Sequence, residues 1–168
     1  MHYLVDAYNL LFRILKKRGP LEKNRQKLIA ELNEEISQLK LQVTLVFDGA
    51  GEHLPHPTRG HFDATELVYT SKSQTADEYI AEEVSLSRTP AEITVVTNDR
   101  ELSSRCRAYR AKILTIDQFL DFLMKKKTKK KRTVSPPART FRDSDPEISR
   151  LLMIFEKRML ENFKDLFD

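Results

Sequence analysis

The chain has 168 residues with a net charge of +4, and 40% of its residues are hydrophobic. This length and composition favour one globular domain with an appendage. No apolar run approaches the roughly 20 residues that cross a bilayer. The first residues lead into a strand rather than a signal peptide, so we expect no membrane partner. The single cysteine, Cys106, excludes an internal disulfide and a cysteine-based zinc site, and it favours a reducing cytoplasm.

Short apolar runs alternate with helical patterns along the first three quarters of the chain. Strands are predicted at residues 2–6, 42–48, 66–70, 93–97 and 112–115. Helices are predicted from residue 7, across 24–39, from residue 75, from residue 98 and across 116–124. Runs rich in Val, Leu, Ile and Thr are typical of strands buried on both faces of a parallel sheet. Their order predicts an α/β fold with a mainly parallel sheet of about five strands joined by right-handed crossovers.

Two helix starts and one long loop can be placed more closely. Thr75 and Glu78 have the spacing of a capping box, and Asn98 and Glu101 repeat that spacing. Residues 49–63 contain three glycines, two prolines and three histidines, which predicts a long loop after the second strand. The histidines match no zinc pattern, so an exposed loop is favoured over substrate contact.

Four aspartates lie at the ends of these elements. Asp6, Asp48 and Asp99 follow predicted strands, and Asp77 lies at the start of a helix. Ligands of open α/β sheets bind at the carboxyl ends of the strands, where gathered carboxylates repel one another unless a cation neutralises them. Oxygen ligands suit Mg²⁺ or Mn²⁺, which activate water for attack on a phosphodiester. The aspartates therefore predict a metal-dependent phosphodiester-cleaving site.

Each of these residues also has a structural interpretation. In the first turn of a helix, Asp77 and Asp99 interact favourably with the helix dipole. Asp48 precedes Gly49 and suits an ordinary turn. Asn9 could orient water or phosphate, or cap the following helix, and both interpretations stay open. The placement of four carboxylates at corresponding topological positions favours the functional interpretation of the set.

Positive charge is concentrated after the predicted domain, which ends near residue 124. The run at 125–132 predicts an RNA contact that raises affinity, or else a solvated spacer, and its basic residues are Lys125, Lys126, Lys127, Lys129, Lys130, Lys131 and Arg132. Arg105, Arg107, Arg110 and Lys112 add charge just upstream. Residues 125–146 are predicted as a basic and proline-containing linker. Residues 147–168 predict an amphipathic helix that docks on its own domain, on a partner or on a second copy.

Five segments resemble the NYN domain, a branch of the PIN-like nuclease superfamily. They are LVDAYNLL at 4–11, NRQKLIAEL at 24–32, VTLVFDG at 43–49, LVYTSKSQTADEYI at 67–80 and VVTNDREL at 95–102. Their order and spacing are most similar to the YacP-like subgroup, over about residues 1–124. The family's usual Asp-Gly-Tyr-Asn is present here as Asp6-Ala7-Tyr8-Asn9.

The resemblance implies a PIN-like three-layer sandwich in which Asp6, Asp77 and Asp99 hold the metal and Asp48 lies close to them. Asn9 matches the family's asparagine and is expected in the catalytic set.

Arg25 matches a family arginine at the start of the long helix, and we place it with the nucleic-acid-binding residues. The implied activity is Mg²⁺- or Mn²⁺-dependent cleavage of RNA, and some YacP-like members act on messenger RNA in the context of the ribosome. A non-catalytic RNA- or ribosome-binding module and a DNA-directed nuclease of the same fold are the alternatives. The complete acidic set favours an enzyme, and the lack of an evident duplex-binding element disfavours DNA.

Overall fold

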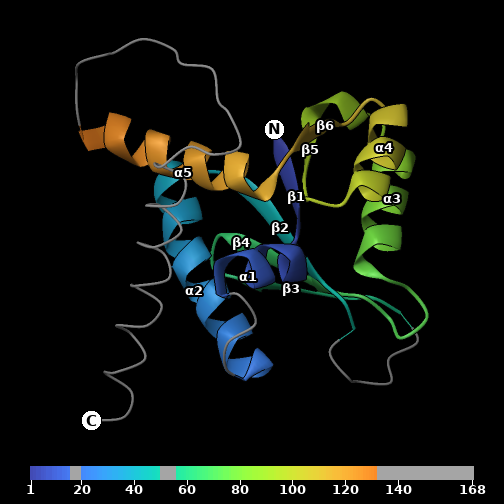
Figure 1. Cartoon of the computed structure of the whole chain (residues 1–168), viewed down its shortest axis with the longest axis horizontal. Helices are drawn as coiled ribbons and strands as arrows, with labels where there is room; N and C mark the ends of the chain where they lie inside the picture. The colour runs from blue at the N-terminus through green and yellow to red at the C-terminus, as the bar shows by residue number, and fades with distance from the viewer. Residues whose placement is uncertain (16–19, 50–55, 132–168) are drawn as a thin grey trace.

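The computed structural model describes residues 1–15, 20–49 and 56–131 (Figure 1). Its elements, in chain order, are β1 (His2–Asp6), α1 (Ala7–Leu15), α2 (Leu21–Leu39), β2 (Gln42–Phe47), β3 (Thr58–Phe62), β4 (Thr65–Tyr69), α3 (Ala76–Leu86), the 3-10 turn η1 (Pro90–Glu92), β5 (Ile93–Val96), α4 (Arg100–Ala108), β6 (Lys112–Leu114) and α5 (Ile116–Lys131). In this part of the chain, no helix is long and apolar enough to cross a membrane.

The strands form one six-stranded sheet in the order β3-β4-β2-β1-β5-β6. All neighbouring strands are parallel except β3, which pairs antiparallel with β4 at one edge. The five predicted strands are therefore confirmed, and β3 is an addition. The prediction of an uninterrupted loop over 49–63 was wrong for residues 58–62. Every residue of β3 is exposed, so it lacks the apolar pattern that marks a buried strand and is held by backbone pairing.

Helices cover both faces of the sheet, which makes a three-layer PIN-like sandwich as predicted. Figure 1 shows α2 and α5 on one side of the strands and α3 and α4 on the other. Side chains of successive β1 residues enter different cores, because strand side chains alternate between faces. Val5 packs in the core that includes α1, α2 and α5, whereas Leu4 packs in the core that includes α3 and α4.

The strand order reverses beside β1, which fixes where a ligand can bind. From β1 the chain moves to β2 on one side and returns later to β5 on the other side. Such a reversal opens a crevice at the carboxyl ends of the two strands. Asp6 ends β1, and Asp99 follows β5. The fold therefore brings these two predicted site residues to the carboxyl ends of two neighbouring strands, which we call the acidic edge of the sheet.

The last described helix is longer than predicted. We placed its end near residue 124, but α5 continues to Lys131. Lysine is a good helix former, and the added turn has local support: the Lys125 ammonium lies 2.7 Å from the Asp121 carboxylate, and the Lys126 ammonium lies 4.8 Å from the centre of the Phe122 ring. Residues 125–131 are thus helical rather than linker. Residues 132–146, the predicted helix at 147–168, Arg132 and His53 lie outside the described residues.

Candidate active site

Asp6 is the most enclosed of the four aspartates, with 8% of its surface exposed. It shares a face of β1 with Leu4, two residues earlier, and therefore lies on the side of the sheet covered by α3 and α4. Its Oδ1 accepts a hydrogen bond of 3.0 Å from the backbone N–H of Asn9, and the Asn9 side chain also bonds this carboxylate. Asp6 thus caps the first turn of α1, and Asn9 holds it in place.

Asp48 is positioned by a close approach between β2 and the segment after β4. A side chain at Gly49 would place its Cβ 2.9 Å from the carbonyl oxygen of Thr70, so the packing requires glycine. The Gly49 N–H donates to the Thr70 hydroxyl at 2.9 Å. Asp48 itself is exposed, and its Oδ1 accepts from the backbone N–H of Ala76, the first residue of α3. This bond ties the end of β2 to the start of the helix that carries Asp77.

Asp77 lies in the first turn of α3, behind a complete capping box. The Thr75 hydroxyl accepts from the Glu78 N–H, and the Glu78 carboxylate accepts from the Thr75 N–H, as predicted. Asp77 is not required for that cap, so its carboxylate is available to the edge of the sheet. Burial, followed by the nearby carboxylates of Asp99 and Asp48, raises the pKa of Asp77.

Asp99 is the N-cap of α4, and its Oδ1 accepts from the Leu102 N–H at 2.8 Å. The predicted capping box between Asn98 and Glu101 was therefore wrong by one residue. The side-chain oxygen of Asn98, Oδ1, instead accepts from the Ile116 N–H at 3.0 Å and connects the end of β5 to the start of α5. The local spacing could not reveal this use, because Ile116 is distant in sequence.

The four aspartates form one electrostatic group at this edge of the sheet. Burial raises the pKa of Asp6 to about 6, and the carboxylates of Asp77 and Asp48 add to that increase. The Asn9 hydrogen bonds oppose it by stabilising the charged form. Asp77 links the group further, because Asp99 and Asp48 both raise its pKa, while Arg105 lowers it. The convergence of these residues on one metal site stays a prediction.

The donor set suits a hard divalent cation, because it consists of carboxylate oxygens with an excess of negative charge. Across residues 1–15, 20–49 and 56–131, however, no three His, Cys, Asp or Glu side chains are grouped closely enough to hold a metal ion as they stand. Asp6, Asp48 and Asp99 each accept a hydrogen bond from a backbone N–H group.

Arg25 has partners within the fold. Its guanidinium lies 5.3 Å from the centre of the Tyr69 ring and 6.0 Å from that of Phe47, and it forms an ion pair with Glu22. Only 13% of its side chain is exposed. These contacts give Arg25 a structural role at the ends of β2 and β4, and its predicted contact with nucleic acid stays a prediction.

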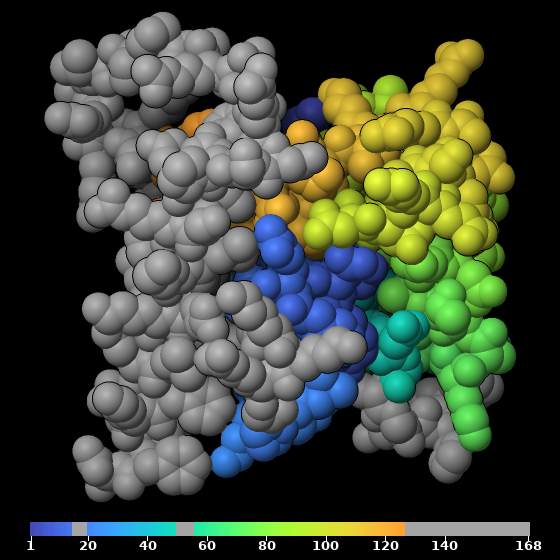
Figure 2. Space-filling model, in the orientation of Figure 1, coloured from blue at the N-terminus to red at the C-terminus, as the bar shows by residue number. Residues whose placement is uncertain are grey.

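A row of aromatic rings borders the acidic edge, and the sequence analysis did not identify it. Phe47 and Tyr69 stack with ring centres 5.4 Å apart, and Tyr8 meets Phe47 edge-on at 5.4 Å. Each ring adjoins a residue of the predicted motifs, Tyr8 beside Asn9 and Phe47 beside Asp48. Phe47 and Tyr69 are the last residues of β2 and β4, and Tyr8 lies in the first turn of α1; these positions are the signal that could have revealed the rings. Figure 2 shows atoms of α1 in blue and of α4 in yellow on one face of the molecule.

The comparisons with known proteins agree with this architecture. The YacP-like NYN domain model matches residues 3–168. The chain belongs to the YacP-like NYN domain family. This family is one of PIN-like nucleases. The family match extends past residue 124, where the resemblance was expected to end, and includes the C-terminal segment.

Two crystal structures resemble this YacP-like domain along almost its whole length. Rae1 (YacP) from Bacillus subtilis has a TM-score of 0.62 at 21% identity, over 99% of this chain and 94% of that one. A single-substitution variant of the same protein has a TM-score of 0.60 at 20% identity, over 96% of this chain and 99% of the other. At this identity the likeness establishes the fold. No curated protein matches the sequence.

Proposed function

We propose that this YacP-like protein is an endoribonuclease that requires a divalent metal ion, Mg²⁺ or Mn²⁺. The observation that carries the proposal is the mutual electrostatic influence of Asp6, Asp48, Asp77 and Asp99 at the carboxyl ends of the strands. A protein does not gather three carboxylates around a buried aspartate without a compensating interaction, because the charged forms repel one another. Arg105 lowers the pKa of Asp77, and burial together with the carboxylates of Asp99 and Asp48 raises it.

The chain's own residues have distinct tasks in this proposal. Asp6, Asp77 and Asp99 would hold the ion, and Asp48 would lie at the rim. When bound, the ion lowers the pKa of water and neutralises charge developing at phosphorus. Asn9 keeps the Asp6 carboxylate oriented through its two hydrogen bonds. RNA as the substrate class follows from the family and from the positive charge at 125–131. Action at the ribosome, a cytoplasmic location and docking of the 147–168 helix stay predictions.

Substitution of Asp99 and Asp77 by asparagine tests the proposal directly. Removal of groups that merely orient metal ligands lowers activity by about 10–100-fold, so loss of a ligand is expected to lower Mn²⁺-dependent RNA cleavage by at least about 100-fold. Glu92→Gln is the matched control, because Glu92 is exposed and directly precedes β5. It therefore lies at the amino ends of the strands, opposite the carboxyl ends that carry the aspartates. Cleavage at the wild-type rate by Asp77→Asn and Asp99→Asn would refute the metal site. If the wild type binds RNA but does not cleave it with either ion, the protein is a binding module instead.

A further inference from the structure

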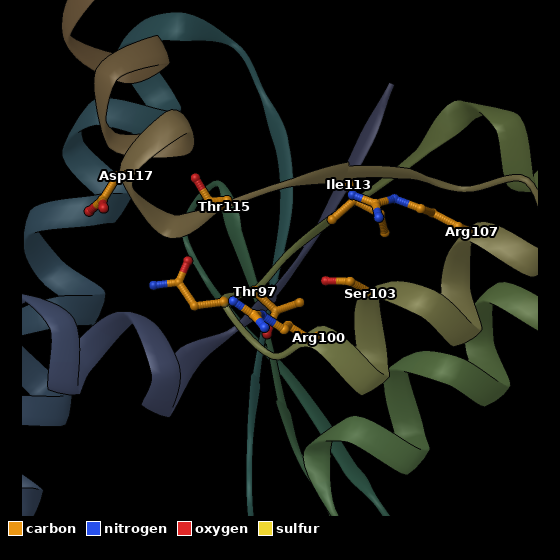
Figure 3. Close-up of a pocket in the computed structure, with 8 residues that line it drawn as sticks. Thr97, Arg100, Ser103, Arg107, Ile113, Thr115 and Asp117 are labelled. Atoms are coloured by element: carbon orange, nitrogen blue, oxygen red, sulfur yellow. The ribbon is translucent and has the colours of Figure 1, made fainter. Parts of the chain in front are cut away.

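A cavity of about 580 Å³ lies beside the acidic edge, between α4 and the ends of β5 and β6 (Figure 3). Its volume is in the range of small-molecule sites, roughly 300–1,000 Å³. Two of its lining residues, Asn98 and Arg100, directly flank Asp99. The cavity is therefore adjacent to the proposed reaction centre, yet none of the four aspartates lines it.

Two arginines give this cavity its positive charge. Arg100 and Arg107 are two helical turns apart on the same side of α4, and both are exposed. Figure 3 shows the Arg107 side chain extending from α4 towards Ile113, and the Arg100 side chain beside Thr97. Neither guanidinium forms an ion pair with a carboxylate in the described part of the chain. Their hydrogen-bond donors are thus available to a ligand.

Two further polar side chains of the cavity, those of Asn98 and Thr115, also supply donors. The Asn98 side-chain oxygen is already bonded to the Ile116 N–H, which leaves its NH₂ group for a ligand. The Thr115 hydroxyl oxygen accepts from the Gln118 N–H, so its hydrogen is available.

The one carboxylate in the lining is neutralised by its own partner. Asp117 receives two hydrogen bonds of 2.8 Å from Arg13, one at each oxygen. Its charge therefore does not cancel that of the two arginines on α4. The groups that remain for a ligand, on Arg100, Arg107, Asn98 and Thr115, are N–H and O–H donors, and together they carry a positive charge. Guanidinium groups pair with phosphate through two parallel hydrogen bonds, so the ligand chemistry that fits is a phosphate-bearing one.

We propose that this cavity binds one nucleotide of an RNA strand, next to the nucleotide held at the acidic edge, and that Arg100 and Arg107 bind its phosphate. The inference rests on the proposed function, because it takes the substrate to be RNA. Asn98 and Arg100 flank Asp99, so a strand bound at the acidic edge reaches the cavity as its neighbouring subsite. The pair acts as a positioning element for the strand and does not touch the cleaved bond.

RNA binding in the presence of EDTA tests the subsite without any contribution from cleavage. Fluorescence anisotropy with a short labelled single strand gives the dissociation constant and its dependence on salt for the wild type, Arg100→Gln and Arg107→Gln. Each substitution is expected to weaken binding roughly tenfold, the effect of a hydrogen-bonded charge. Each is also expected to lower the log–log salt slope by about 0.7, the value for one phosphate contact of a single strand. Both side chains are exposed, and an unchanged thermal unfolding midpoint verifies that the variants are folded.

Arg110→Gln is the matched control, because Arg110 is an exposed arginine just past α4 that does not line the cavity. It is expected to change the dissociation constant less than about twofold, as for an exposed charge. Equal losses in Arg107→Gln and Arg110→Gln would overturn the subsite, because the effect would then be general attraction. Binding of a nucleoside monophosphate or inorganic phosphate that needs both arginines, with RNA binding unaffected by them, would also overturn it and would identify a site for free phosphates.

The two proposals fail in different ways. If the wild type cleaves RNA with Mn²⁺ and the two arginines leave RNA affinity unchanged, the subsite alone is refuted. If the wild type cleaves no RNA, the proposed enzymatic function is refuted whatever the anisotropy shows. The result expected is a cleaving wild type whose arginine variants bind RNA more weakly.

Discussion

Replacement of Asp6 by asparagine is expected to stabilise the metal-free protein at neutral pH. The ordinary pKa of an aspartate is 3.8, and that of Asp6 is raised to about 6, first by burial and then by Asp77 and Asp48. The difference corresponds to about 3 kcal/mol of native-state destabilisation when Asp6 is charged, since each pKa unit is worth about 1.4 kcal/mol. Asparagine keeps the side-chain oxygen that accepts from the Asn9 N–H but removes the charge.

The sign of the pH dependence follows from the same shift. A carboxylate whose pKa is raised on folding binds its proton more tightly in the native state. Its charge therefore destabilises the fold fully above about pH 6 and not at all well below the unfolded value of 3.8. The stability of the wild type should accordingly fall relative to Asp6→Asn as the pH rises from about 4 to 7. The expected gap is about 3 kcal/mol near pH 7.5 and about 0.5 kcal/mol near pH 4.

Urea unfolding of both proteins in EDTA, at several pH values, measures this gap. The control is Asp121→Asn, because Asp121 pairs with Lys125 and lies away from the four aspartates. Addition of Mn²⁺ should stabilise the wild type more than Asp6→Asn, since a ligand that binds only the native state raises its stability. A gap that stays constant between about pH 4 and 7.5, or a variant less stable than the wild type at about pH 7.5, would show that Asp6 is not strained electrostatically.

Three further outcomes are expected. Gly49→Ala should lower the free energy of unfolding by about 1–3 kcal/mol in urea titrations, because the new Cβ would lie 2.9 Å from the Thr70 carbonyl oxygen, and an unchanged midpoint would contradict this packing. Asn33→Ala should lower the free energy of unfolding by about 2–4 kcal/mol, because the Asn33 side-chain oxygen accepts from the buried Thr65 hydroxyl and from the Ala64 backbone N–H. A change under about 0.5 kcal/mol would refute that role. Replacement of the lysines of 125–131 by glutamine should reduce the salt slope of RNA binding by about 0.7 per lost phosphate contact without changing cleavage positions, and an unchanged slope would identify the run as a spacer.

The part of the fold that depends on burial was predictable from sequence. The strands β1, β2 and β5 are buried at nearly every position, so their residues form the apolar runs by which such strands are recognised. Strand β3 was missed because all of its residues are exposed and it therefore has no apolar run. The end of α5 was also missed, because a run of lysines is compatible with a linker and with a helix. The contacts of Lys125 with Asp121 and of Lys126 with Phe122, which support the helix, are visible only in the structure.

The positions of the aspartates in the fold were predictable from sequence, and their detailed geometry was not. The position of an aspartate after a buried strand places it at the carboxyl edge of the sheet, and for that step the sequence suffices. The orientation of its carboxylate depends on partners far along the chain. Asp48 accepts from the N–H of Ala76, and Asn98 accepts from that of Ile116. Neither pair follows from local spacing, and so neither the separation of the carboxylates nor the cavity beside Asp99 could be anticipated.

Helix capping and metal binding were opposed interpretations of these aspartates in the sequence, and the structure makes them compatible. Asp6, Asp48 and Asp99 each accept a hydrogen bond from a backbone N–H through one carboxylate oxygen, Oδ1. A carboxylate has two oxygens and about four lone pairs, so such a bond leaves capacity for a cation. The same bonds fix the carboxylates in place while no cation is bound, because each cap belongs to a helix that is packed on the sheet. The helix starts thus supply the rigidity that an array of repelling charges needs in order to stay assembled.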